Sequence, residues 1–203
     1  MGGRAVVYTN GIMRAERAGR RAGSVARSIA AAMVVALAVT ACGPAPGPGR
    51  PAPAPGVLGL GDSVMLGASG ALQAAVPGIQ VDAVVSRQFR EAPGIAFWKS
   101  QAGVLPGTVV VHLGTNGTVL PGTCDELMAV LGDRRVILVD LTVPRPWEAG
   151  NNVTLRDCAA RDGAAFVDWH AVSAGRADLL APDGFHLNAA GAAAYAAAIA
   201  AAL

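Results

Sequence analysis

The sequence VLGLGDSV at residues 57–64 decides the fold of this chain. Its first part, 57–60, is a short apolar run, which is typical of a strand buried on both faces. A Gly-Asp-Ser turn follows, and an Ala/Leu-rich segment with helical spacing, 65–75, comes next. A strand that leads directly into a helix predicts the first unit of an α/β fold.

Four more short apolar runs continue this pattern, with Ala/Leu-rich segments between consecutive runs. The runs are 79–85, 108–113, 136–141 and 165–167. The helical segments are 91–102, 124–132, 153–161 and 189–202, the last with Asn188 as its N-cap. This alternation predicts a three-layer α/β/α sandwich with a five-stranded parallel sheet. Ligands of such folds bind at the carboxyl ends of the strands, so polar residues there are candidates for chemistry.

Two of the predicted strands end in loops with polar side chains. Ser63 lies where the first strand becomes a helix, and a helix N-terminus favours developing negative charge. A Gly-Asp-Ser turn that only caps the helix is the structural alternative. Asn116 lies on a glycine-rich turn after the third strand, where its amide can donate a hydrogen bond to an oxyanion. The alternative for Asn116 is an Asx-turn.

An acid and a histidine precede the last predicted helix. Asp183 stands three residues before His186 on a loop, so its carboxylate can orient the imidazole and stabilise the imidazolium. The histidine can then take the proton of a serine hydroxyl. The alternative is a loop carboxylate beside a surface histidine, so the hypothesis of a serine nucleophile depends on all three loops together.

Taken in order along the chain, the three motifs resemble those of the SGNH (GDSL-type) hydrolase family. The resemblance covers residues 57–203 and implies a flavodoxin-like α/β/α fold. It implies that Ser63 is the nucleophile, that His186 is the general base and acid, and that Asp183 is the partner of the histidine. Asn116 and the main-chain N–H of Ser63 would belong to the oxyanion hole.

The sequence departs from the family pattern after the second predicted strand, where the family usually has a glycine that donates to the oxyanion. This chain has Ser86 at that position. A main-chain N–H is present whatever the side chain, so Ser86 remains the expected third donor of the oxyanion hole. A residue with a Cβ nevertheless tolerates fewer main-chain conformations than glycine.

Further runs look like the extracellular SGNH domains of bacterial membrane acyltransferases, which resemble peptidoglycan O-acetyltransferases. These runs are Ser-Arg-Gln at 86–88, Val-Pro-Arg-Pro-Trp at 143–147 and Val-Asp-Trp at 167–169. The expected substrate-binding residues are Arg87, Gln88, Arg145 and Trp147. Trp147 would offer a stacking face to a sugar; the alternative is a Trp packed inward in a rigid Pro-bounded loop.

The resemblance implies an acyl-serine enzyme that acts on small acyl esters, acetyl above all, of cell-envelope glycans. An esterase would pass the acyl group to water and a transferase would pass it to a sugar hydroxyl, in which case a separate membrane acyltransferase is the expected partner. The alternative is a non-catalytic glycan-binding lipoprotein, although a binding protein has no need for all of Ser63, Asp183 and His186. No cofactor is expected.

The N-terminal segment, 1–41, predicts export. A basic stretch, 1–27, precedes a 14-residue apolar run, shorter than the about 20 residues that a transmembrane helix needs. The Val-Thr-Ala-Cys sequence that ends at Cys42 resembles a bacterial lipobox, so Cys42 is expected to carry the lipid of a membrane anchor on the outer face of the cytoplasmic membrane. An ordinary signal peptide is the alternative. The Pro/Ala/Gly-rich stretch 42–56 predicts an extended linker before the domain, 57–203.

The remaining composition excludes other classes of protein. From Cys42 onward there are 10 basic and 13 acidic residues, a net charge of −3, which supplies no basic face for nucleic acid. Cys124 and Cys158 are expected to form a disulfide in an oxidising location, with two buried thiols as the alternative. Three scattered histidines and no Cys-x-x-Cys pair argue against a zinc site. His112 is expected in the core and His170 near the active edge.

Overall fold

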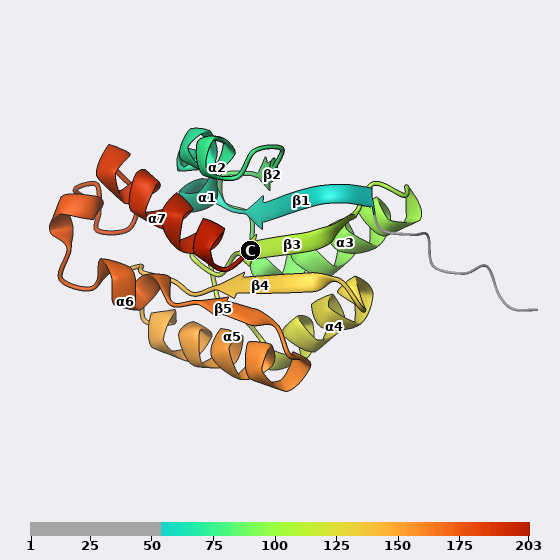
Figure 1. Ribbon diagram of the computed structural model, residues 1–203. Coiled ribbons are helices and arrows are strands. Elements are labelled where there is room, and N and C mark those ends of the chain that lie inside the picture. Colours follow the sequence, from blue (N-terminus) through green and yellow to red (C-terminus); the bar gives the residue numbers. More distant parts are fainter. Residues whose placement is uncertain (1–53) are drawn as a thin grey trace, which may run out of the picture. The chain divides into compact units, whose positions relative to one another are not determined.

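The computed structural model describes residues 54–203 and shows a parallel sheet of five strands (Figure 1). The strands are β1 (Ala54–Gly61), β2 (Gln80–Ala83), β3 (Pro106–His112), β4 (Arg135–Val139) and β5 (Ala165–Val167). Their order across the sheet is β2-β1-β3-β4-β5, and every neighbouring pair is parallel. The order reverses between β1 and β3, and open α/β sheets bind ligands at such a switch point. Ser63 and Asn116 follow these two strands.

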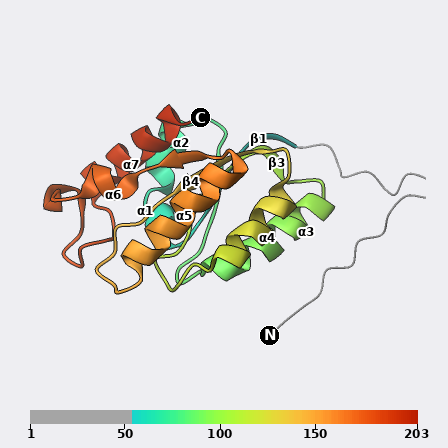
Figure 2. The same ribbon diagram turned by 90° about the horizontal axis from the view of Figure 1, so that it is seen from below.

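Helices cover both faces of the sheet. They are α1 (Ser63–Gly67), α2 (Ser69–Ala75), α3 (Ala92–Gln101), α4 (Pro121–Leu131), α5 (Glu148–Asp162), α6 (Trp169–Ser173) and α7 (Ala189–Ala201). Two short 3₁₀ helices are η1 (Phe89–Glu91) and η2 (Ala177–Leu179). Figures 1 and 2 show α3, α4 and α5 on one side of the sheet and α1, α2, α6 and α7 on the other. The three-layer α/β/α architecture expected from the sequence is confirmed.

Alternate residues of each strand point to opposite faces and build two cores. Leu60, Val111 and Leu138 pack toward α3, α4 and α5. Val110 and Ile137, one position along their strands, pack toward the helices of the other face. All five side chains are at most 1% exposed. Burial on both faces explains why these strands are nearly continuous apolar runs and not alternating ones.

Gly59 and Gly61 keep one face of β1 clear for the helix that follows. A Cβ at Gly61 would lie 2.4 Å from the Cβ of Met65, and one at Gly59 would lie 3.1 Å from its sulfur. Met65 is fully buried against this face. The two glycines therefore let α1 lie directly against the strand, which brings Ser63 to the sheet edge.

Several element boundaries differ from the predicted ones. The segment 65–75 forms two helices divided at Ala68, and α4 begins at Pro121, three residues before the expected start. Proline is suited to the first helical turn, where its missing N–H is not needed. The start of α5 at Glu148 and the short α6 were also not predicted, since the polar first turn of α5 masks its periodicity. The second strand ends at Ala83, two residues early.

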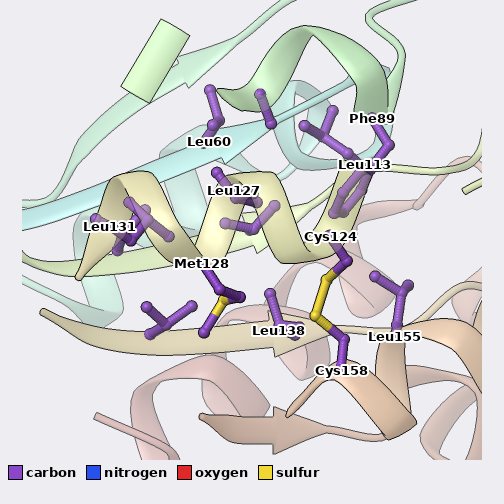
Figure 3. Packing of buried hydrophobic residues seen from close by; sticks show 14 of the residues in the cluster. Leu60, Phe89, Leu113, Cys124, Leu127, Met128, Leu131, Leu138, Leu155 and Cys158 are labelled. Atoms are coloured by element: carbon purple, nitrogen blue, oxygen red, sulfur yellow. A yellow bond between two sulfur atoms is a disulfide. The ribbon is translucent and has the colours of Figure 1, made fainter. Parts of the chain in front are cut away.

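The disulfide Cys124–Cys158 joins α4 to α5 on the face of the sheet that these helices cover (Figure 3). The two Cα atoms are 6.4 Å apart, and both residues are fully buried among leucines of the same core. The bond closes a loop of 34 residues along the chain. In the chain-entropy model, such a loop contributes about 4 kcal/mol to the free energy of unfolding.

The proposed signal segment, 1–41, and Cys42 lie outside the described residues. Most of the expected linker does too, but its last residues belong to β1, because Ala54 pairs with Pro106 of β3. In the part of the chain that the structure describes, no helix combines the length and the apolar character needed to cross a membrane.

Candidate active site

The turn between β1 and α1 holds Ser63 at the carboxyl edge of the sheet. Ser63 is the first residue of α1, and Asp62 is its N-cap. The Oδ1 atom of Asp62 accepts a hydrogen bond of 3.0 Å from the N–H of Val64. Asp62 is fully buried, and its side chain fixes the turn from inside the protein. Ser63 next to it is half-buried. The Gly-Asp-Ser turn is thus an N-cap and also presents a hydroxyl.

His186 reaches this hydroxyl from the loop before α7. Its Nε2 atom lies 3.0 Å from the Ser63 Oγ atom, and its Nδ1 atom lies 2.7 Å from Oδ2 of Asp183. The other oxygen of Asp183 accepts the main-chain N–H groups of Phe185 and His186, at 3.1 and 3.0 Å. The loop therefore fixes the carboxylate with main-chain hydrogen bonds, and the carboxylate fixes the ring. A serine–histidine–carboxylate chain of this kind can activate a hydroxyl for attack on an ester.

The electrostatics of Asp183 suit this arrangement. Burial works to raise the pKa of its carboxyl, but the hydrogen bonds from the His186 ring and from two main-chain N–H groups outweigh that effect. The net result is a pKa below the usual value for aspartate. Asp183 is therefore ionised at neutral pH and can stabilise a positive charge on the imidazole.

Asn116 lies on the loop after β3, and three hydrogen bonds from the side chain of Asn151 hold this loop in place. The Nδ2 atom of Asn151 donates to the carbonyls of Gly114 and Gly117, at 3.0 and 2.9 Å, and its Oδ1 atom accepts the N–H of Val119 at 2.8 Å. Asn151 is buried in α5. Sequence reasoning missed it, because nothing near position 151 marks it as a partner of a loop more than thirty residues away.

Ser86 adopts a left-handed main-chain conformation with φ of 64°. It is the sole non-glycine residue with positive φ among residues 54–203. This is the position where the related family usually has glycine, and the structure shows why glycine suits it. A non-glycine residue in this conformation lowers the stability of the folded protein by on the order of 1 kcal/mol, so Ser86 is held in a strained main-chain conformation.

Arg87 and Gln88 were expected to bind substrate, but both side chains form hydrogen bonds with other residues of the chain. The guanidinium of Arg87 donates to the carbonyl of Gly61 at 3.3 Å and to the carboxylate of Asp82 at 2.8 Å. The side chain of Arg87 is only 9% exposed. Gln88 forms a capping box at the start of η1 with reciprocal hydrogen bonds to Glu91.

Arg145 and Trp147 lie on the loop after β4. Arg145 is exposed, whereas Trp147 is half-buried and lines a cavity of about 490 Å³. The indole N–H of Trp147 is buried and has no hydrogen-bond partner in the described part of the chain. The opposite wall of the cavity includes Val119 and Leu120, which continue the Asn116 loop. The loop after β4 also approaches the histidine loop, since a Cβ at Gly184 would lie 3.8 Å from Pro144.

The other two histidines have structural partners. His112 is buried at the end of β3, with its Nδ1 atom 2.7 Å from the hydroxyl of Tyr195 on α7. Burial lowers the pKa of His112, although Asp62 nearby opposes this. The Nδ1 atom of His170 lies 2.8 Å from Oε1 of Glu148, whose other oxygen accepts the N–H of Val143 at 3.0 Å. His170 thus helps to fix the loop that carries Trp147.

One group of acidic and sulfur side chains comes close enough together to suggest a metal among residues 54–203: Asp125, Cys158 and Asp162. The sulfur of Cys158 is bonded to Cys124, so this group offers no thiolate.

Asp140, a further buried carboxyl, lies at the carboxyl end of β4. Its Oδ1 atom accepts the N–H of His170 at 2.8 Å, and Arg156 lies 3.8 Å from its other oxygen. Burial raises the pKa of Asp140 to about 6, with the neighbouring Asp168 adding to the effect. An acid near the end of the apolar run 136–141 is a signal that sequence reasoning could have used.

No protein-family model matches the chain. The chain is 37% identical over 136 residues to the peptidoglycan O-acetyltransferase OatA of Listeria monocytogenes, a match that covers 67% of this chain and 22% of that protein. It is 33% identical over 132 residues to the putative peptidoglycan O-acetyltransferase YrhL of Bacillus subtilis, covering 64% and 21%. The matched region is therefore about a fifth of the length of these relatives.

Solved structures give a fuller match. The C-terminal catalytic domain of Streptococcus pneumoniae peptidoglycan O-acetyltransferase A, solved with a methylsulfonyl adduct, is 31% identical with a TM-score of 0.62. The match covers 75% of this chain and 94% of that domain. The acetylxylan esterase Axe2 of Geobacillus stearothermophilus has a TM-score of 0.55 at 17% identity, over 74% of this chain and 94% of that one, and shares the fold.

The raised pKa of Asp140 predicts how stability depends on pH. The folded protein keeps this proton up to about pH 6, whereas the unfolded chain releases it near 3.8. The contribution of Asp140 to the free energy of unfolding is therefore fully present below 3.8 and is lost as the pH rises to about 6. Between about pH 3.5 and about pH 7, we expect the wild type to lose roughly 2 kcal/mol more than Asp140→Asn.

Urea unfolding of both proteins at the two pH values measures this difference. Equal changes in the free energy of unfolding would show that Asp140 does not hold its proton more tightly in the folded state.

Proposed function

The chain belongs to the SGNH (GDSL-type) hydrolase family, and from this premise we propose that it is an exported serine enzyme of the cell envelope. It moves small acyl groups, acetyl above all, from or to the hydroxyls of envelope glycans through an acyl-serine intermediate. The hydrogen-bonded chain from Ser63 through His186 to Asp183 carries this proposal. A protein that only binds glycan has no use for a hydroxyl, a base and a carboxylate in this order.

In the first step, the Oγ atom of Ser63 attacks the ester carbonyl as His186 Nε2 takes its proton across the 3.0 Å hydrogen bond. The tetrahedral intermediate places negative charge on the former carbonyl oxygen. The Asn116 amide and the main-chain N–H groups of Ser63 and Ser86 are the proposed donors to that oxygen. When the intermediate collapses, the alcohol leaves with the proton from His186, and Ser63 remains acylated.

The second step repeats the first with a new nucleophile. Water or a sugar hydroxyl gives its proton to His186 and attacks the acyl-serine. Collapse of the second intermediate returns the proton to Ser63 and releases either the free acid or an acylated sugar. Asp183 holds the imidazole in one tautomer through both steps, because its Oδ2 atom accepts from the Nδ1 position.

The cavity beside Trp147 is the proposed site for the sugar. Its walls come from residues 118–121, which follow Asn116 along the chain, from Pro146 and Trp147 after β4, and from the first turns of α5. A volume of about 490 Å³ lies within the usual range for small-ligand sites. The indole of Trp147 offers an apolar face to a sugar ring. Arg145 lies on the same loop and is exposed to a longer glycan.

Lipid attachment at Cys42 is the proposed anchor, supported by the sequence before it. The anchored enzyme would work at the outer face of the cytoplasmic membrane, with a separate membrane acyltransferase as the proposed acyl supplier. Expressed in a bacterium that processes lipoproteins, the wild type should stay with the membrane fraction and Cys42→Ser should not. Equal retention of both proteins would contradict the anchor.

Turnover of 4-nitrophenyl acetate by the purified protein tests the chemistry. We expect Ser63→Ala to abolish turnover, because the nucleophile is gone. We expect Asn116→Ala to lower kcat by about 10²–10³, the usual effect of losing one oxyanion donor. Circular dichroism checks that both variants remain folded. Wild-type turnover by Asn116→Ala would show that the oxyanion assignment is wrong, and folded wild type without activity on short acyl esters would favour the glycan-binding alternative.

Addition of a chitooligosaccharide separates transfer from hydrolysis. If Trp147 holds the acceptor, Trp147→Ala lowers the yield of acetylated sugar by up to about tenfold and leaves hydrolysis nearly unchanged. Mass spectrometry of the sugar and release of 4-nitrophenol measure the two outcomes. Trp98→Ala is the matched control, since Trp98 is 71% exposed on α3. An equal loss of both outcomes in Trp147→Ala would rule out a role in acceptor binding.

A further inference from the structure

The side chain of Arg87 ties together the ends of two strands below the candidate site. It comes from the segment between β2 and η1 and is almost buried. One guanidinium nitrogen donates to the carbonyl of Gly61, the last residue of β1, and to the carbonyl of Asp82 in β2. The other guanidinium nitrogen forms a 2.8 Å ion pair with the carboxylate of Asp82. Arg87 therefore fixes the strand end that lies two residues before Ser63.

Asp82 is anchored from a second direction. Its other carboxylate oxygen lies 2.8 Å from the ammonium of Lys99 on α3. Partial burial works to raise the pKa of Asp82, but the hydrogen bonds from Lys99 and Arg87 outweigh it and hold the pKa below the usual value. The carboxylate is thus charged at neutral pH and joins β2, α3 and the segment of Arg87.

The main chain of Arg87 makes the contact that matters for chemistry. Its carbonyl oxygen accepts a hydrogen bond of 3.3 Å from the Nδ2 atom of Asn116. The end of the Asn116 side-chain amide that faces this carbonyl is its NH₂ group, because the amide oxygen and the carbonyl oxygen would repel each other. An amide nitrogen carries two N–H groups, so one remains for a substrate oxygen. The residue before Arg87 is Ser86, the strained position proposed as another donor.

We propose that Arg87 is a positioning residue for acyl transfer, whose buried guanidinium fixes the segment 84–88 so that its own carbonyl orients the Asn116 amide toward the oxyanion. The inference rests on the proposed function. It assigns to Arg87 a role through Asn116, in place of the contact with substrate that the sequence suggested. Without the guanidinium, the segment is free to shift, and misplacement of a catalytic group by about 1 Å can lower a rate by about 10².

A double-mutant cycle on purified full-length protein tests this role. We expect Arg87→Met to lower kcat for 4-nitrophenyl acetate by about 10-fold to 100-fold with little change in KM. In the Asn116→Ala background, the same substitution should lower kcat by a clearly smaller factor, because one of the groups that the segment of Arg87 positions is absent. A merely structural role predicts equal factors in the two backgrounds, and that result would overturn the proposal.

Two further variants keep the test decisive. If Arg87→Met does not fold, Arg87→Lys takes its place, because lysine keeps the charge facing Asp82 but cannot reach both carbonyls in the same fork geometry. Wild-type kcat in Arg87→Lys would also overturn the proposal. Arg90→Met is the matched control, since Arg90 is exposed on η1 and its loss should leave kcat unchanged.

The outcome is separable from the fate of the proposed function. Ser63→Ala, measured in parallel, shows whether turnover depends on the serine at all. Serine-dependent turnover with equal Arg87→Met factors in both backgrounds would overturn the role of Arg87 alone. Turnover that persists in Ser63→Ala would overturn the proposed function itself, and with it the role of Arg87.

Discussion

The close approach of α1 to β1 is the constraint on which the rest of the structure depends. Two strand positions without side chains, Gly59 and Gly61, admit Met65 against the sheet. The helix can then start immediately after the strand, and the buried Asp62 side chain satisfies one of its first N–H groups. Ser63, as the first residue of this helix, therefore lies at the carboxyl edge of the sheet. A larger residue at position 61 would push α1 away and move the hydroxyl with it.

The polar groups around this edge hold one another in place before any ligand arrives. Main-chain N–H groups fix Asp183, a buried amide from α5 fixes the loop of Asn116, and Arg87 fixes the end of β1. The contacts of Asn151 and Arg87 join an element of the scaffold to a loop at this edge, whereas those of Asp183 lie within its own loop. Hydrogen bonds set before the reaction need no reorganisation when charge develops, which is the main source of catalytic power in sites of this kind.

The sheet and the loops of the serine, histidine and aspartate could be predicted because short stretches of sequence indicate each of them. Apolar runs define the buried strands, and Asp183 lies close enough to His186 along the chain for their pairing to be expected. Asn151, by contrast, acts on a loop that only the folded chain brings near, so no local pattern marks it. Arg87 was expected to contact substrate. Its actual partners, Gly61 and Asp82, belong to two strands, and the sequence does not specify that these strands pair. Polar contacts between residues far apart in the sequence can be predicted only once the order of the strands in the sheet is known.

The proposed chemistry requires that the hydrogen-bonded chain make Ser63 a nucleophile. Treatment with methanesulfonyl fluoride, followed by peptide mapping, tests it most directly, because a sulfonyl ester on serine is stable and does not depend on the acceptor. We expect a single methylsulfonyl group on Ser63, loss of acetyl-ester turnover in step with labelling, and little labelling in His186→Ala. Labelling of Ser63 at the same rate without His186, or no adduct on Ser63 in the folded wild type, would contradict it.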